Sequence, residues 1–267
     1  MISRTAQGWV LIALLSGCAS DGNKTQDLAQ IYTQMGATYY KRGDYALARE
    51  RLEKALENKP DYAPAHQVMA EVFSRQNRLA DAERHYQTAL ELDGNNPTLL
   101  NNYAVFLCGN NRLAESERYF LRAVADPDYA TPALAYENLG MCMLRVPDVA
   151  KAEEYFKAAL KHDPKLANPL VRLTRLKFDK NEFFNARAFF QRYMEVGPPT
   201  PGMLLLGIQI ERRLGDKTAE KKLREMLTMQ FPDSPEARQV AALITDAVDE
   251  ADVSAYPLNL NPEGKLP

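Results

Sequence analysis

Histidine and cysteine are the side chains here best suited to hold a metal ion or attack a substrate, and each occurs three times in 267 residues. The histidines His66, His85 and His162 are widely spaced and share no carboxylate at ligand spacing. Metal sites, phosphate-binding loops and nucleophile elbows each require a short motif with fixed spacing, and the sequence contains none of them. We therefore expect no enzyme, no metal site, no cofactor and no small-molecule substrate.

The cysteine at position 18 follows a segment with the features of an export signal. Arg4 supplies a positive charge, and seven apolar residues follow over 9–15, too few to cross a bilayer as a helix. Leu15-Ser16-Gly17-Cys18 resembles a bacterial lipobox, in which small residues fit the signal peptidase and the thiol takes a diacylglycerol. The resemblance implies a signal peptide over 1–17 and lipid attachment at Cys18. An ordinary signal peptide that happens to contain a cysteine is the alternative.

The residue after Cys18 indicates a destination. In Gram-negative bacteria an Asp there resembles a signal for retention in the inner membrane, and this chain has Ala19. We therefore expect a lipid-anchored protein on the periplasmic face of the outer membrane. Residues 18–28 are mostly small and polar, which favours a flexible, lipidated tether. The net charge of -2 argues against nucleic acid as a partner, since non-specific binding requires a basic surface.

Small residues recur along the chain at a period close to 34. One column contains Gly36, Ala70, Ala104, Gly140 and Thr174, with spacings of 34, 34, 36 and 34. A second column with the same spacings contains Ala48, Ala82, Ser116, Ala152 and Ala186. With the aromatic, Leu-Gly and Pro positions around them, these columns resemble the tetratricopeptide repeat (TPR), a pair of antiparallel helices that meet at small residues.

The period predicts an all-α fold, a right-handed superhelical TPR solenoid of six repeats. Gly43, Asn77, Asn111 and Asn181 fall in the turns within repeats, where a positive φ is often needed. The third repeat is two residues longer, which predicts a longer turn over 126–132; a neutral surface insertion is the alternative. The expected divisions are a TPR domain over 29–249 and a loosely ordered tail over 250–267. Within that domain we expect repeats at 29–62, 63–96, 97–132, 133–166, 167–200 and 201–234, the last degenerate, and a capping helix at 235–249.

A TPR solenoid binds partners along the concave surface formed by the first helix of each repeat. Positions 2, 5, 9 and 12 of that helix point inward, and in the first three repeats they are small, neutral and partly apolar. Such a groove suits an amphipathic helix or an extended apolar peptide. Tyr40 is expected to be an exposed aromatic anchor. The candidate contact residues are Thr33, Ala37, Tyr40, Gln67, Glu71, Asn101 and Val105.

The two remaining cysteines, Cys108 and Cys142, lie near the ends of consecutive first helices. Because such helices run side by side, a disulfide between them is geometrically plausible. An oxidising compartment such as the periplasm favours it. Two small buried apolar side chains are the alternative.

The stretch from Asn101 to Cys108, NNYAVFLC, resembles the corresponding stretch of the type IV pilus biogenesis/stability lipoproteins, the pilotins of the pilus secretin. The long turn at 126–132 and the second cysteine in NLGMC, Cys142, continue the resemblance; Ala104 in place of Gly is the one departure within the first stretch. The resemblance implies that the chain binds a secretin subunit and promotes its outer-membrane localisation and multimerisation, and hence pilus biogenesis and twitching motility.

A different binding scaffold is the alternative function. A lipid-anchored TPR protein could serve outer-membrane β-barrel assembly or cell-wall hydrolases, and it would share the lipobox and the solenoid. Such a scaffold would not need the NNYAVFLC stretch or the long third turn, and those two features favour the secretin hypothesis.

Overall fold

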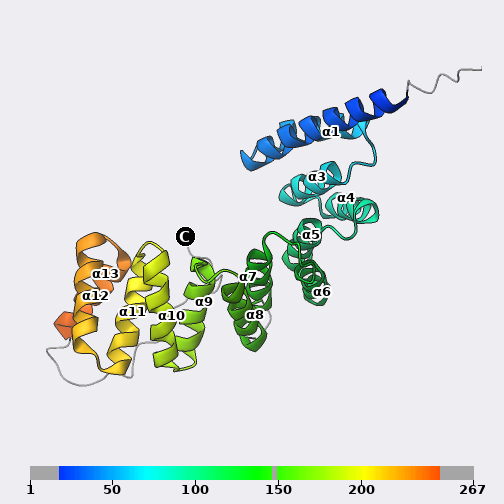
Figure 1. Ribbon diagram of the computed structural model, residues 1–267. Coiled ribbons are helices and arrows are strands. Elements are labelled where there is room, and N and C mark those ends of the chain that lie inside the picture. Colours follow the sequence, from blue (N-terminus) through cyan, green and yellow to red (C-terminus); the bar gives the residue numbers. More distant parts are fainter. Residues whose placement is uncertain (1–17, 146–148, 247–267) are drawn as a thin grey trace, which may run out of the picture. The chain divides into compact units, whose positions relative to one another are not determined.

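The computed structural model of the chain describes residues 18–145 and 149–246, and every regular element in these two ranges is a helix (Figure 1). The helices fall into two compact units, divided between Asp148 and Val149, and each unit is described by itself. The first unit contains α1 (Cys18–Lys41), α2 (Tyr45–Asn58), α3 (Ala63–Arg75), α4 (Leu79–Leu92), α5 (Pro97–Gly109), α6 (Leu113–Val124) and α7 (Pro132–Met143). The second contains α8 (Val149–His162), α9 (Ala167–Asp179), α10 (Phe183–Val196), α11 (Pro201–Leu214), α12 (Lys217–Gln230) and α13 (Pro235–Asp246).

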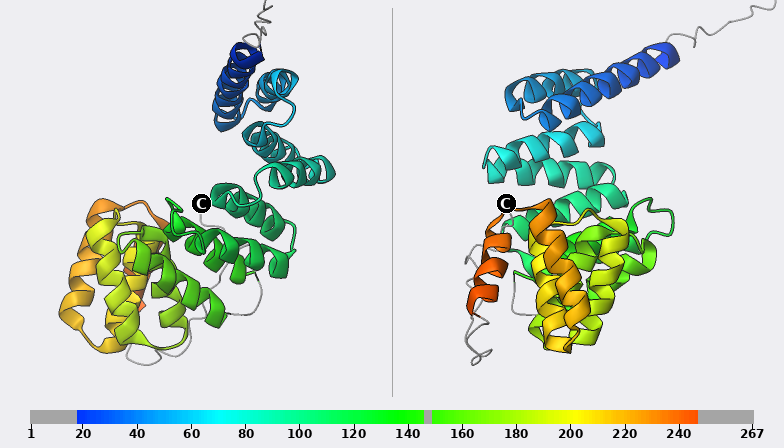
Figure 2. Two further views of the ribbon diagram at one scale, coloured as in Figure 1. Left: turned by 45° about the vertical axis from the view of Figure 1, so that its right-hand side comes forward. Right: turned by 90° about the vertical axis from the view of Figure 1, so that its left-hand side faces the viewer.

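The first unit is a stack of helix pairs. Helices α1 and α2, α3 and α4, and α5 and α6 pack as pairs, and each pair packs on the next one, with α7 on α5 and α6 (Figure 2). Gly43, Asn77 and Asn111 close the turns within these pairs with φ of 81°, 58° and 62°, and Asn181 does the same in the second unit with φ of 59°. The prediction of left-handed turn residues is confirmed at all four positions.

Close contact between paired helices explains the columns of small residues. Ala48, Ala82 and Ser116 are fully buried. A Cβ atom added to Gly36 would lie 2.6 Å from the Cγ atom of Leu52, which is itself fully buried. A larger side chain at position 36 would therefore push α1 away from α2.

The long third turn is more than a surface insertion, because it contributes to the core. Asp126 folds the turn locally: its carboxylate accepts a hydrogen bond from the backbone N–H of Asp128, and its carbonyl accepts one from Tyr129. These bonds leave the Tyr129 side chain buried. The longer turn thus adds a buried aromatic side chain to the core.

A histidine pair lies half-buried within the second repeat. The Nε2 atom of His66 donates to the carbonyl of Pro60 at 2.9 Å, which leaves its Nδ1 to accept from the Nδ1 of His85, also at 2.9 Å. The ring of Phe73 covers His85, with 5.4 Å between the ring centroids. The pair is thus held by one hydrogen bond to the backbone and one between the two rings.

The histidine pair predicts a stability that falls in mild acid. Burial, together with the charges of His66 and Arg84, lowers the pKa of His85 from 6.5 to about 4, although Asp81 opposes the shift. Because the unfolded chain binds the proton more tightly, the stabilisation is complete above pH 6.5 and is lost as the pH falls towards 4. Urea unfolding between pH 7 and pH 4 should show this slope. His85→Gln should flatten this pH dependence of the unfolding free energy. His162→Gln, at an exposed position, should leave it unchanged. Equal slopes in the wild type and both variants would contradict the attribution to His85.

In the second unit, α9 pairs with α10 and α11 with α12, while α8 packs on α9. The final helix, α13, packs on α11 and α12 and buries Ala237 and Val240 against Leu204 and Leu227. The hydroxyl of Ser234 accepts from the backbone N–H of Ala237 and so caps α13 at its N-terminus.

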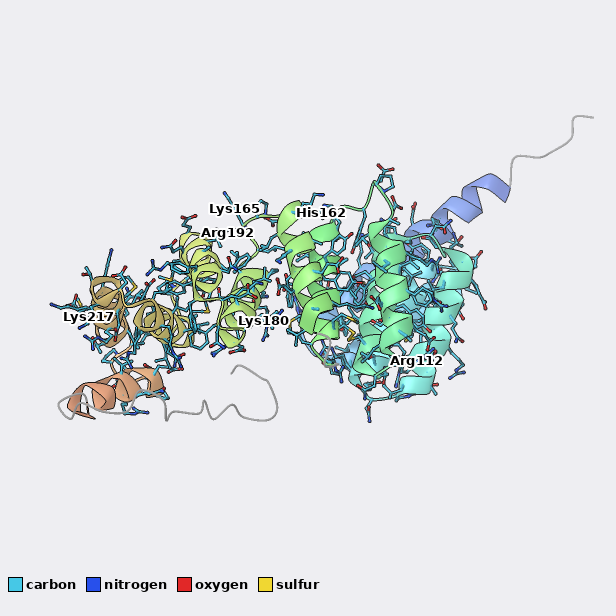
Figure 3. The ribbon with its side chains drawn as sticks, turned by 90° about the horizontal axis from the view of Figure 1, so that it is seen from below. Arg112, His162, Lys165, Lys180, Arg192 and Lys217 are labelled. Carbon is cyan, nitrogen blue, oxygen red and sulfur yellow. A yellow bond between two sulfur atoms is a disulfide. The ribbon has the colours of Figure 1, made fainter. Side chains whose placement is uncertain are left out.

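A buried ion cluster holds α8 and α9 together. The carboxylate of Glu153 on α8 accepts from Lys157, from Lys177 at 2.7 Å and from Lys180 at 2.8 Å. Lys177 is 7% exposed and also contacts Glu182 at 2.8 Å. Figure 3 labels Lys180, at the end of α9. We refer to these five residues as the Glu153 cluster.

The structure departs from the expected division of the chain at one end. The tether predicted for 18–28 is helical, because α1 begins at Cys18. The segment contains no proline, and its Ala, Lys and Gln residues are compatible with a helix, so the first repeat helix extends towards the N-terminus. The predicted signal peptide, residues 247–249 of the predicted capping helix and the predicted tail lie outside the described residues.

Candidate protein-binding face of the first unit

The first helices of successive repeats lie side by side in the first unit. Helix α1 contacts α3, and α5 contacts α7. Side chains on their inward positions can therefore meet across repeats. Four such helices, α1, α3, α5 and α7, form the face on which the sequence analysis places a binding groove.

A continuous chain of hydrogen bonds crosses this face from α7 to α3. The amide of Asn138 donates to Asn101 at 3.3 Å, Asn101 donates to Asn102 at 3.0 Å, and Asn102 donates to Oε1 of Glu71 at 3.0 Å. Gln67 donates to the same oxygen of Glu71 at 3.2 Å. We call these five side chains the amide chain. Because each group fixes the next, the chain holds a rigid row of polar groups.

The carboxylate of Glu71 is the acceptor at the end of the amide chain. Burial raises its pKa above 4.5, and the hydrogen bonds from Gln67 and Asn102 and the charges of Arg75 and Lys41 offset this only in part. Within residues 18–145, no salt bridge reaches Glu71. Its negative charge is thus stabilised mainly by two neutral amides.

An exposed apolar strip lies beside the amide chain. Val105 is 45% exposed and follows Asn101 by one helical turn. Leu134 and Met141, 47% and 37% exposed, lie one turn before and one turn after Asn138 on α7. Residues three or four apart share one face of a helix. The three apolar side chains therefore belong to the same face as the amides, and we call them the apolar strip.

The structure brings four of the seven predicted contact residues together. Gln67, Glu71 and Asn101 belong to the amide chain, and Val105 to the apolar strip. The other three, Thr33, Ala37 and Tyr40, lie in the first repeat, on α1.

The expectations for Thr33 and Tyr40 need correction. Thr33 is 7% exposed, and its hydroxyl donates to the carbonyl of Ala29 one turn earlier, so it offers nothing to a partner. Tyr40 is half-buried instead of exposed: it packs near Tyr45, and its hydroxyl accepts from Arg75 at 3.3 Å. Ala37 is half-buried, and its contact with a partner stays a prediction.

Sequence reasoning missed Asn102, Leu134, Asn138 and Met141. Leu134 and Met141 occupy inward positions 2 and 9 of the fourth repeat, whereas the predicted contacts cover only the first three repeats. Asn102 and Asn138 occupy the next position around the helix, which that count does not include. Their role follows from hydrogen bonds between repeats, which a repeat pattern does not contain.

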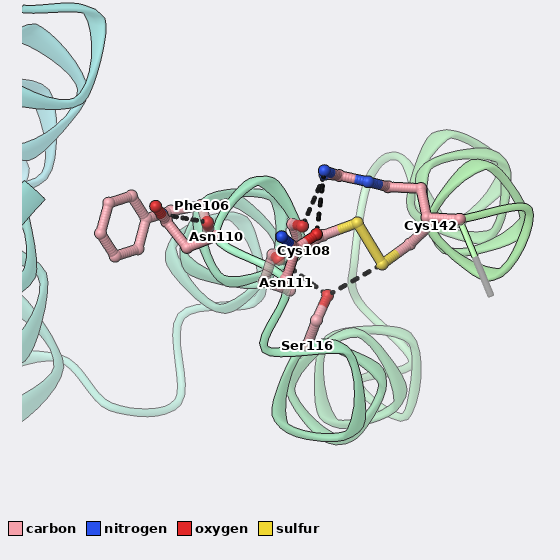
Figure 4. The surroundings of a disulfide bond; sticks show 8 residues. Phe106, Cys108, Asn110, Asn111, Ser116 and Cys142 are labelled. Carbon is pink, nitrogen blue, oxygen red and sulfur yellow. Dashed lines mark hydrogen bonds between the residues drawn. A yellow bond between two sulfur atoms is a disulfide. The ribbon is translucent and has the colours of Figure 1, made fainter. Parts of the chain in front are cut away.

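A disulfide joins α5 and α7 at the end of this face (Figure 4). Cys108 and Cys142 are bonded in the structure, with Cα atoms 5.9 Å apart. The guanidinium of Arg145 donates to the carbonyl of Cys108 at 2.7 Å and to the side-chain oxygen of Asn111 at 3.1 Å. The hydroxyl of Ser116 donates to Ala104 and lies 3.6 Å from the Cys142 sulfur. These contacts fix the spacing of α5 and α7, and with it Asn101 and Asn138.

The stacked helix pairs and the columns of small residues between them define a tetratricopeptide-repeat protein. The tetratricopeptide-repeat family models match residues 27–94, 68–130 and 110–167. The chain is 30% identical to the type IV pilus assembly protein PilF of Pseudomonas aeruginosa, over 91% of this chain and 99% of PilF. It belongs to the family of tetratricopeptide-repeat proteins of type IV pilus biogenesis.

Two solved structures support the same family. A structure of P. aeruginosa PilF aligns with 82% of this chain and 99% of its own, at 29% identity and a TM-score of 0.71. A crystal structure of PilW, described as a widely conserved type IV pilus biogenesis factor, aligns with 80% of this chain and 98% of its own, at 32% identity and a TM-score of 0.66.

The described residues contain neither a membrane-spanning helix nor a metal-binding cluster. No helix there is long and apolar enough to cross a membrane. Nor does that part of the chain contain a group of three or more His, Cys, Asp or Glu side chains that could hold a metal ion.

Proposed function

We propose that this chain is an outer-membrane lipoprotein that binds a subunit of the type IV pilus secretin through the face of its first unit. In doing so it promotes outer-membrane localisation and multimerisation of the secretin, and hence pilus biogenesis and twitching motility. The observation that carries the proposal is its similarity to PilF over nearly the full length of both chains. The lipobox at Cys18 and the NNYAVFLC stretch support the more specific role.

The face of the first unit fits a protein partner. Hydrogen-bonding amides lie beside exposed apolar side chains, a combination that suits a peptide segment of another protein. The amide chain is already ordered before a partner arrives. Binding would therefore cost little side-chain entropy.

Deletion of the gene tests the proposed role. Loss of the protein should remove secretin multimers from outer-membrane fractions and abolish twitching motility, and a plasmid copy of the gene should restore both. Normal secretin multimers and normal motility in the deletion strain would overturn the proposal.

The lipid anchor predicts a separate defect. Cys18→Ser should remove the site of acylation and shift the protein out of the outer-membrane fraction, because acyl chains supply about 0.8 kcal/mol per buried methylene. Sucrose-gradient fractionation and metabolic labelling with an alkyne fatty acid measure both effects. Ser20→Ala, two residues away, is the control; equal fractionation and labelling of the two variants would rule out an anchor at Cys18.

A further inference from the structure

Glu71 is a carboxylate with an incomplete set of partners. An ionised carboxylate has about four acceptor sites, and the hydrogen bonds from Gln67 and Asn102 both go to one of its oxygens, Oε1. Burying a charge without an opposite charge is unfavourable. A partner that brings a positive group to this carboxylate would relieve that penalty.

The nearest cations of the chain do not fill this role. The Nε atom of Arg75 donates to Tyr40 at 3.3 Å, and the Arg75 side chain is exposed. Lys41 is exposed as well, at the last residue of α1. Both act on Glu71 through charge at a distance, and neither forms a salt bridge with it among the described residues.

The surroundings of Glu71 also restrict which partner can approach. The remaining members of the amide chain are neutral, so they do not compete with Glu71 for a cation. An acidic segment or a terminal carboxylate would meet a like charge there. Val105, Leu134 and Met141 continue the same face with exposed apolar surface.

From these contacts we propose that Glu71, held by Gln67 and Asn102, is a subsite for a lysine or arginine side chain of the bound protein. The apolar strip then receives the apolar residues that flank this basic side chain. The inference rests on the proposed function, because it assumes that this face binds a protein. It adds the chemistry of the recognised segment: one basic residue next to apolar residues.

Selection of peptides from a random library tests the inference without assuming a partner. Full-length protein, purified from membranes in detergent, would be immobilised and panned against the library. Peptides enriched on the wild type should contain Lys or Arg beside apolar residues, and this enrichment should disappear with Glu71→Gln. Gln keeps an oxygen that accepts from Gln67 and Asn102, so the change removes the charge and preserves the hydrogen bonds. Glu91→Gln, an exposed position on α4, should select the same peptides as the wild type.

Affinities of one selected peptide complete the test. Replacing its basic residue by norleucine should weaken binding to the wild type by about tenfold or more, and should have little effect on binding to Glu71→Gln. This comparison alters the peptide, so it remains decisive even if the variant is less stable. Peptides without basic residues, or equal losses on both proteins, would overturn the subsite.

The inference and the proposed function can fail separately. If basic residues are enriched through Glu71 while secretin multimers are normal in the deletion strain, the subsite holds and the secretin role is wrong. If the deletion strain lacks secretin multimers while the library shows no basic enrichment, the secretin role holds and the subsite is wrong.

Discussion

Replacing Glu153 by Gln is expected to lower the free energy of unfolding of the second unit by about 3 kcal/mol. The change keeps the shape of the side chain but removes the charge that neutralises Lys177, which is 7% exposed. Among the described residues, Glu182 would then be the one carboxylate paired with Lys177. An ammonium group left in this position without sufficient charge compensation is strongly destabilising, and the loss should appear in urea unfolding followed by circular dichroism.

The pH dependence of the unfolding free energy provides a second test of the Glu153 cluster. Burial alone would raise the pKa of Glu153, but hydrogen bonds from Lys157, Lys177 and Lys180 overcome burial and lower it from 4.5 to about 2. The cluster therefore stabilises the fold fully above pH 4.5 and progressively less as the pH falls towards 2. Glu153→Gln should abolish this part of the acid sensitivity.

The neighbouring residue provides a matched control. Glu154 is exposed on the same helix, so Glu154→Gln removes the same charge from α8 without leaving a lysine unpaired. We expect its unfolding free energy to lie within about 0.5 kcal/mol of the wild type. Equal losses for the two variants would show that the effect belongs to the net charge of the helix and not to the cluster.

Removal of the disulfide is expected to have an effect of similar size in the first unit. The bridge closes a loop of 34 residues, for which the loss of unfolded-chain entropy corresponds to about 4 kcal/mol. Replacing both Cys108 and Cys142 by Ala should therefore lower the unfolding free energy by about that amount. Wild-type protein treated with dithiothreitol should become as unstable as the variant, and the variant itself should not respond to the reductant.

Mass spectrometry of the protein isolated from cells checks the bridge itself. Without reduction, one pair of peptides should contain Cys108 linked to Cys142. Free, alkylated thiols at both positions would rule out the bridge, and the two cysteines would then be small apolar residues of the core. An unchanged unfolding free energy after the double substitution would contradict its structural role.

The fold could be predicted from sequence because its determinants are local and repeated. The small residue at Ala48 recurs at Ala82 for the same reason, close helix contact. A turn that needs a positive φ selects Gly43 or Asn77 wherever it occurs. Each repeat thus supplies another instance of one pattern, and the helix bounds follow the period.

The candidate site was less predictable, because it depends on which side chain each residue meets. Thr33 occupies an inward position, but its hydroxyl bonds to its own helix. Tyr129 lies in a turn whose sequence is typical of the protein surface, but its side chain is buried. Lys157 is four residues from Glu153 and can be anticipated, whereas Lys177 reaches Glu153 only through the packing of α9 on α8. Such contacts arise between elements and have no fixed spacing in the sequence.

Quantitative co-purification from membranes tests the central proposal most directly. Tagged full-length protein would be isolated after mild cross-linking, and the co-purifying proteins measured by mass spectrometry. The double change Val105→Glu and Met141→Glu places charge in the apolar strip. Phe184→Glu places it at an apolar position of the second unit that is 76% exposed. We predict that the pilus secretin subunit is strongly enriched with the wild type and with Phe184→Glu, and falls at least about tenfold with the double variant. Absence of the secretin from the wild-type sample, or equal recovery with all three proteins, would contradict the account.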